Sequence, residues 1–218
     1  MFIGHFGLGF GARKAAPAVS LGALFLAAQF ADLLWPTLVL LGVERVAIEP
    51  GATAVTPLNF ISYPYSHSLL ALCGWGILVG AVYAAVTRSS AAAAVTLAIL
   101  VVSHWVLDAV SHRPDMPLTL RGDARVGLNL WSSVAGTLLV ELTLFTIGVF
   151  LYVRATAPRD RIGSAGVWTL VGFLIVIELA NVLGPPPPNV PAVAWAAQAI
   201  WLLVLWGYWV DRHRQARG

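Results

Sequence analysis

The sequence predicts an all-α protein, a polytopic bundle of membrane-spanning helices. Of its 218 residues, 59% are hydrophobic and only 11% are charged, whereas an average soluble domain has about 25% charged residues. The mean hydropathy is +0.81, and apolar runs of about 20 residues recur along the whole chain. A soluble surface would need roughly a quarter of its positions charged, so the apolar surplus must face lipid.

About six spans are expected, together with a short-helix hairpin at the N-terminus. The first apolar stretch is short, rich in glycine and interrupted by Arg13 and Lys14. The run that follows contains Asp32 and Pro36, which indicates a broken or hairpin element. Five longer runs are each long enough to span a bilayer, and they cover residues 66–86, 91–110, 127–153, 165–183 and 191–210. No stretch remains for a second module, so residues 1–218 are expected to form one membrane-embedded domain.

The distribution of Lys and Arg predicts the orientation, because cytoplasmic loops carry an excess of these residues. With Arg13 and Lys14 on the cytoplasmic side, that side collects nine of the 13 basic residues and places the C-terminus inside. The connectors 44–65 and 112–126 then lie outside and hold most of the non-apolar chemistry. The basic residues form no continuous stripe, so no nucleic-acid partner is expected.

Five ionisable residues interrupt the predicted spans: Asp32, His104, Asp108, Glu141 and Glu178. Each costs about 2.5 to 3.5 kcal/mol inside a membrane and therefore needs a partner or a function. His104 and Asp108 are four apart and share a helix face, and His112 follows one turn later. Three such residues on one face are hard to explain by packing alone, whereas they are typical metal ligands. Cys73, the only cysteine, lies in an apolar run and predicts a buried core residue.

Three further residues are expected near this face. His67 begins the preceding span on the outer side, at the same level as His104. A helix over residues 5–14 covers about 15 Å, and residues 18–32 return about 21 Å, which brings His5 toward Asp32. The expected cluster consists of His5, Asp32, His67, His104 and Asp108. Each histidine taken alone could also be a buried, hydrogen-bonded core residue, and Glu141 and Glu178 could be outer acceptors or polar contacts between helices.

The motifs around these residues resemble a known family. Gly4-His5, the Ala31-Asp32 pair, Ser66-His67-Ser68 and the run from Ser103 to Asp108 resemble the YdjM-like family of bacterial inner-membrane metal-dependent hydrolases, over roughly the first 115 residues. That family is distantly similar to zinc-dependent phospholipase C. The first acidic motif is shorter here, because Leu-Leu-Trp-Pro follows Asp32 where the family often has a second carboxylate and a histidine, which implies a smaller ligand set.

The resemblance implies that His5, Asp32, His67, His104 and Asp108 are ligands of a divalent metal, zinc, manganese or iron. The expected activity is hydrolysis of a phosphorylated lipid, or of another membrane-accessible substrate, at the outer face of a bacterial inner membrane. Asp108 or Asp32 would act as general base if it is not a ligand. Arg113, Arg121 and Arg125 are candidates for binding an anionic head group, because guanidinium groups match phosphate.

Two other classes of function fit the same residues. Intramembrane carboxylates and a broken helix also mark the binding sites of ion-coupled transporters, although no internal repeat is visible in this sequence. A non-catalytic membrane scaffold could use the His/Asp cluster as a structural metal site or a hydrogen-bond network. The clustering of polar groups near one face argues against the transporter.

Overall fold

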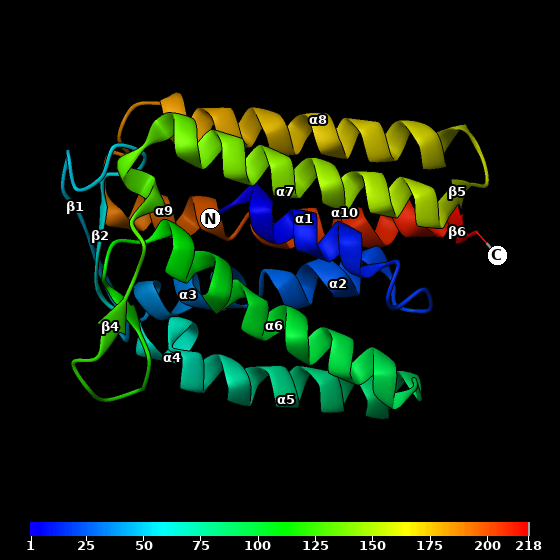
Figure 1. The fold of residues 1–218 in the computed structure, drawn as a ribbon, viewed down its shortest axis with the longest axis horizontal. Coiled ribbons are helices and arrows are strands. Elements are labelled where there is room, and N and C mark those ends of the chain that lie inside the picture. Colours follow the sequence, from blue (N-terminus) through cyan, green and yellow to red (C-terminus); the bar gives the residue numbers. More distant parts are fainter. Residues whose placement is uncertain (218) are drawn as a thin grey trace.

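The computed structural model describes residues 1–217 and confirms the all-α membrane bundle (Figure 1). Its α-helices are α1 (Ile3–Ala12), α2 (Leu21–Ala28), α3 (Phe30–Leu40), α4 (Pro64–His67), α5 (Leu69–Thr87), α6 (Ala91–Ser111), α7 (Val134–Ala155), α8 (Arg161–Leu183), α9 (Val190–Ala197) and α10 (Ile200–Arg212). Five helices are long and apolar enough to cross a membrane, counting Val190–Arg212 as one, and the bent pair α2–α3 brings the number to six. The chain is therefore a multi-pass membrane protein.

Three short antiparallel strand pairs lie at the two ends of the bundle. Strands β1 (Arg45–Ile48) and β2 (Leu58–Ser62) pair at one end, and β3 (Met116–Pro117) pairs with β4 (Arg125–Val126) at the same end. We call this the site end; it is on the left in Figure 1. Strands β5 (Thr156–Pro158) and β6 (Arg214–Ala216) pair at the opposite, far end. Both polar connectors predicted from the sequence thus lie together at the site end.

Helix α1 lies at the centre of the bundle, packed against α7 and α2 (Figure 1). Its contact with α7 is a close approach of two backbones. A Cβ added at Gly148 would lie 1.9 Å from the Gly7 carbonyl oxygen, and one added at Gly7 would lie 2.8 Å from the Leu144 carbonyl oxygen. Small residues allow membrane helices to approach in this way. The contact fixes the position of His5, two residues before Gly7.

The predicted N-terminal hairpin is present, and it is what brings the first two site residues together. After α1 the chain turns at the far end, where Arg13 forms an ion pair with Asp211 at 3.1 Å, and the Ser20 side chain caps α2 by accepting a hydrogen bond from Ala23 N. The axis then bends by 56° between α2 and α3. Asp32 lies in the first turn of α3, at the same end of the bundle as His5.

Three details differ from the expectation. The run 127–153 does not span from its start: Leu128 N and Asn129 N donate to the carbonyls of Ala109 and His112, which ties residues 127–133 to α6, so α7 begins only after the Ser133 cap. The run 191–210 is divided at residues 198–199 into α9 and α10. Cys73 is only half-buried, because α5 is a peripheral helix whose outer side chains are exposed for contact with lipid.

Candidate metal centre

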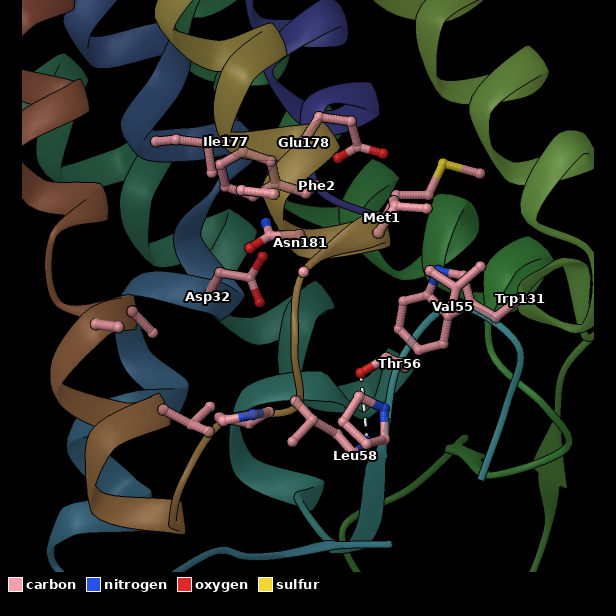
Figure 2. A pocket seen from close by; sticks show the side chains of 18 of the residues that line it. Met1, Phe2, Asp32, Val55, Thr56, Leu58, Trp131, Ile177, Glu178 and Asn181 are labelled. Atoms are coloured by element: carbon pink, nitrogen blue, oxygen red, sulfur yellow. Dashed lines mark hydrogen bonds between the residues drawn. The ribbon is translucent and has the colours of Figure 1, made fainter. Parts of the chain in front are cut away.

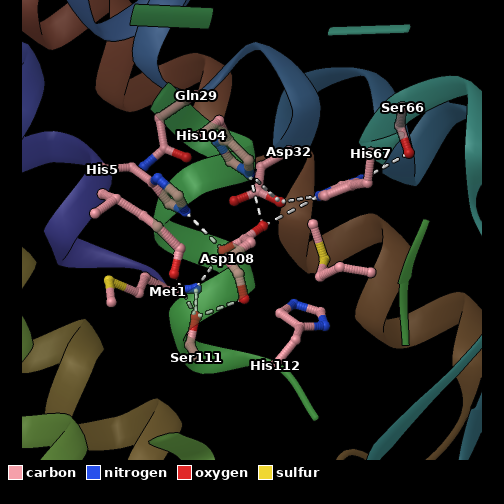
Figure 3. A network of polar contacts seen from close by, with 12 residues as sticks. Met1, His5, Gln29, Asp32, Ser66, His67, His104, Asp108, Ser111 and His112 are labelled. Atoms are coloured by element: carbon pink, nitrogen blue, oxygen red, sulfur yellow. Dashed lines mark hydrogen bonds and ion pairs between the residues drawn. The ribbon is translucent and has the colours of Figure 1, made fainter. Parts of the chain in front are cut away.

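The five side chains predicted to cluster do converge at the site end, inside the bundle (Figure 3). They come from four helices: His5 from α1, Asp32 from α3, His67 from α4, and His104 and Asp108 from α6. His5, His67, His104 and Asp108 are at most 3% exposed, while the Asp32 side chain is 24% exposed. Polar groups buried to this extent need partners, which these side chains find partly within the cluster and partly in Met1, Ser66 and the Ala28 carbonyl.

Asp108 is the centre of the cluster. Its Oδ1 accepts a hydrogen bond from the α-amino group of Met1 at 2.6 Å and lies 3.1 Å from His5 Nε2. Its Oδ2 lies 3.2 Å from His104 Nε2 and 3.7 Å from His67 Nε2. The i, i+4 spacing on α6 places His104 and Asp108 on one face, as the sequence predicts.

Asp32 completes the cluster on the side that is open to the cavity described below. Its Oδ1 lies 3.5 Å from His67 Nε2 and 3.8 Å from His104 Nε2. These separations are too long for hydrogen bonds. Two overlapping sets of residues could hold an ion, since their ligand atoms lie within 4.8 Å of one another: His5, His104 and Asp108, and Asp32, His67 and His104.

The residues fit a divalent metal for two reasons. Ligands of a tetrahedral ion bound at about 2.1 Å lie about 3.4 Å apart, and the His–Asp distances in the cluster, 3.1 to 3.8 Å, bracket this value. In addition, His104 Nε2, which faces Asp108 and Asp32, is buried without a hydrogen-bond partner. The donor set of imidazoles and carboxylates suits zinc, manganese or iron.

Contacts outside the cluster orient two of the imidazoles as ligands. His104 Nδ1 lies 2.8 Å from the Ala28 carbonyl oxygen, which can only accept, so this nitrogen carries a proton and, in the neutral ring, Nε2 keeps its lone pair. His67 Nδ1 lies 2.7 Å from Ser66 Oγ, and Ser66 Oγ donates in turn to Glu44 Oε2 at 2.6 Å. Because the serine hydroxyl uses its single proton in the hydrogen bond to the carboxylate, it accepts from His67 Nδ1. Both Nε2 atoms therefore face the centre with free lone pairs.

Glu44 and Ser66 were missed by sequence reasoning. Glu44 is 1% exposed, and its Oε1 accepts hydrogen bonds from the backbone N–H groups of Tyr65 and Ser66, at the start of α4, at 2.8 and 2.9 Å. The only signal available was the place of Glu44 in a polar connector that ends at the predicted His67 motif. Glu44 and Ser66 are 22 positions apart in the sequence, and their contact depends on the β1–β2 hairpin.

His112, which the sequence places on the same face as His104 and Asp108, lies outside both ligand sets. Helix α6 ends at Ser111, and the extended backbone of His112 turns its side chain off that face. His112 Nδ1 instead lies 2.9 Å from Asp115 Oδ1, and Tyr63 donates to the same oxygen at 3.0 Å. Burial and the neighbouring Asp115 carboxylate raise the pKa of Tyr63 well above its usual value, so it remains a hydrogen-bond donor.

Glu141 and Glu178 lie beside the cluster and have different environments. Glu141 Oε2 accepts from the backbone N–H groups of Phe2 and Gly4 at 2.7 and 3.2 Å, which fixes the start of α1 against α7. Glu178 is 1% exposed, and its Oε1 has no partner. Glu141 is thus an outer acceptor that holds α1, one of the two roles expected for it.

The cluster forms one end of a cavity of about 940 Å³. Asp32, His67, Asp108 and His112 line it, as do Glu141, Glu178 and Asn181. Figure 2 shows Asp32, Glu178 and Asn181 near one another around this space, with Val55 and Thr56 of the β1–β2 connector and Leu58 of β2 at its edge. The volume is at the upper end of the range for small-molecule sites, and the metal-ligand candidates are therefore accessible to a ligand.

Comparison with known proteins does not identify this chain. No protein-family model, no curated protein and no solved structure matches it. The resemblance to the YdjM-like family thus depends on the short motifs alone. The interpretation of the site depends on its geometry.

The three arginines expected to bind a head group do not line the cavity. Arg113 donates to Asp115 Oδ2 at 3.1 Å and to the side chain of Asn59. Arg121 is exposed in the segment that joins β3 to β4, and Arg125 is exposed at the start of β4. Arg113 is held by its partners, so any contact of these groups with a substrate would be at the rim of the site end. Their role in binding stays a prediction from the sequence.

The arrangement can therefore hold a divalent cation and offer a carboxylate beside it. Both oxygens of Asp108 are engaged by neighbours within the cluster, whereas Asp32 is partly exposed toward the cavity. Asp32 is consequently the better placed of the two to exchange a proton with water or with a ligand. This division of roles is set by location, because the two carboxylates are chemically alike.

Proposed function

We propose that this protein is a membrane-embedded, metal-dependent hydrolase that cleaves a phosphoester of a lipid or another membrane-accessible substrate. The observation that carries the proposal is the convergence of three histidines and two aspartates from four helices, next to a cavity large enough for a ligand. A divalent ion held there would supply Lewis-acid chemistry, polarising a phosphoryl oxygen and making water a stronger acid.

The residues of the site would have different roles, set by their positions. His5, His104 and Asp108, whose ligand atoms lie within 4.8 Å of one another, would hold the ion, with His67 beside them; the orientations of His67 and His104 would be set by Ser66 and by the Ala28 carbonyl. Asp32 lies at the cavity wall within 3.8 Å of two of these imidazoles. It would accept the proton of the attacking water as general base. The buried position excludes bulk water, which strengthens each of these electrostatic contacts.

The proposed location is the inner membrane of a bacterial cell, with the C-terminus in the cytoplasm and the site end outside. The support is the distribution of Lys and Arg among residues 1–217. Nine of these basic residues lie at the far end of the bundle, and the other four, Arg45, Arg113, Arg121 and Arg125, lie at the site end. The positive-inside rule then assigns the far end to the cytoplasm. The substrate would come from the outer leaflet.

The experiment is a screen of phospholipids in detergent micelles with protein loaded with zinc or manganese. Wild-type protein should release a phosphorylated product, and Asp32→Asn should abolish the release while still binding metal. Asp160→Asn, at an exposed far-end position, is the matched control and should remain active. Metal-loaded protein that hydrolyses none of the lipids would contradict a phospholipid as the substrate and favour a structural role for the metal.

A further inference from the structure

The cavity beside the metal centre has a second, apolar part that the chemistry of the cluster does not use. Phe173 and Ile177 of α8 line it on one side, and Leu202, Leu203 and Trp206 of α10 line it on the other. We call this part the apolar arm. The Phe173 and Trp206 rings lie 5.5 Å apart, centre to centre, toward the far end. The arm is continuous with the space that contains Asp32 and Asp108.

The arm exists because α8 and α10 are close at the far end and line a cavity at the site end. A Cβ added at Gly163 would lie 2.0 Å from the His213 carbonyl oxygen, and one added at Gly166 would lie 2.8 Å from the Trp209 ring. Two turns further along α8, Phe173 and Ile177 face the cavity instead. The two helices thus approach closely over their far halves, whereas toward the site end both line the cavity.

The arm opens at the depth of the hydrocarbon. Phe173 is 45% and Leu202 is 66% exposed, although both belong to spans. Phe173 lies ten residues before the end of α8 at Leu183, which corresponds to about 15 Å along a helix. Half of a hydrocarbon core about 30 Å thick has the same length. The arm thus reaches from the head-group level to about the middle of the bilayer, the depth of one acyl chain.

The other end of the cavity offers acceptors for hydrogen bonds. Four carboxylates line it, and no Lys or Arg of the described residues 1–217 does. The Glu178 Oε1 atom is buried without a partner, and Asn181 lies one turn further along α8. A buried carboxylate oxygen without a donor is costly, and a ligand that carries N–H or O–H groups would satisfy it.

We infer that the substrate is a membrane lipid that lies lengthwise in this cavity, with an acyl chain in the apolar arm between α8 and α10 and a head group bearing N–H or O–H donors against Glu178. The lipid would reach the site sideways from the bilayer, through the opening at Phe173 and Leu202, without leaving the hydrocarbon. The inference rests on the proposed function, because it names the substrate of the same site. Lipid binding is nevertheless measurable without turnover.

The test uses proteoliposomes that contain phosphatidylethanolamine with a diazirine in the middle of one chain. After illumination, the labelled residues are mapped by mass spectrometry, with and without an excess of unmodified lipid. Saturable labelling should concentrate on the segments around Ile177 and Leu202. Ile177→Trp fills the arm and should remove most of this labelling, whereas Val176→Trp, on the lipid-facing surface next to it, should leave it unchanged.

Recognition of the head group is tested separately, by competition between lipids. Glu178→Leu should weaken competition by unmodified phosphatidylethanolamine and by phosphatidylglycerol, which carry ammonium and hydroxyl donors respectively. The lipid whose competition is weakened more identifies the donor that Glu178 recognises. Even labelling of all lipid-facing helices, unaffected by Ile177→Trp, would overturn the inference. Saturable labelling without hydrolysis would instead contradict the proposed function and leave the lipid site standing, so the two failures are distinguishable.

Discussion

Removing the hydroxyl of Ser66 should weaken metal binding without removing any ligand. In Ser66→Ala the hydrogen bond between His67 Nδ1 and Ser66 Oγ, 2.7 Å long, is lost. The Glu44 carboxylate keeps the backbone N–H groups of residues 65 and 66 as donors, so the start of α4 remains fixed. The His67 ring loses the partner that orients it, and Glu44 Oε2 loses the donor Ser66 Oγ.

The size of the effect follows from the burial of His67, which is 3% exposed. An unpaired buried donor costs about 1 to 3 kcal/mol, and the ring can avoid this cost by turning its Nε2 away from the centre. Loss of an outer partner of a ligating histidine typically lowers metal affinity 10- to 100-fold, which corresponds to about 1.4 to 2.7 kcal/mol. Both routes predict a decrease of one to two orders of magnitude in affinity for zinc.

The assay is competition for zinc between purified protein in detergent and a chromophoric chelator of known affinity. Ser90→Ala is the matched control, because the Ser90 side chain also makes a hydrogen bond, accepting from Ala93 N at 3.3 Å as the cap of α6, but it lies at the far end, away from the cluster. The control should lose about 1 kcal/mol of stability and keep wild-type affinity for zinc. Equal affinities for Ser66→Ala and wild type would refute the role assigned to the Glu44–Ser66–His67 contacts.

Three other perturbations test the bundle that positions the site. Gly148→Ala should lower the thermal unfolding temperature in detergent, because its Cβ would lie 1.9 Å from the Gly7 carbonyl oxygen. Gly172→Ala, with open space around it, should leave the unfolding temperature unchanged. Equal changes in the two variants would argue against the close α1–α7 contact. Glu141→Leu orphans the N–H groups of Phe2 and Gly4 and should cost about 1 to 3 kcal/mol for each that is fully buried, while Glu141→Gln keeps the acceptor and should cost less in the same unfolding assay. The hydrogen bond from His213 lowers the pKa of Asp160. This contact therefore stabilises the far end at pH values above the ordinary carboxyl pKa of about 4, and the stabilisation is lost as the pH falls through the lower pKa of the folded state. The hydrogen-exchange protection of the β6 amides should fall in that acid range in wild type and show no such step in Asp160→Ala.

The sequence was sufficient for the class of fold and for the cluster, because both depend on strong local signals. Charged residues are so scarce that Asp32, His104 and Asp108 stand out inside apolar runs. Helical periodicity then places His104 and Asp108 on one face, and the hairpin turn at Arg13 returns the chain far enough to bring Asp32 to His5.

What the sequence did not show depends on contacts between distant segments. The Ser66–Glu44 contact requires the β1–β2 hairpin, and the departure of His112 from the ligand face depends on where α6 ends, a boundary that propensity alone does not set. The residues 127–133 are apolar enough to continue a span, yet tertiary hydrogen bonds to α6 keep them out of the helix. The apolar arm depends on the positions of Gly163 and Gly166 against α10, which no local pattern reveals.

The central claim, that the His/Asp cluster holds a divalent metal, is tested most directly by the metal content of the purified protein. Elemental analysis of detergent-purified wild type should find at least one zinc, manganese or iron per chain, and His104→Ala should lose it. His213→Ala, a change to a histidine at the far end, should keep the wild-type amount. Wild-type protein that contains no such metal and takes none up from solution would contradict the claim.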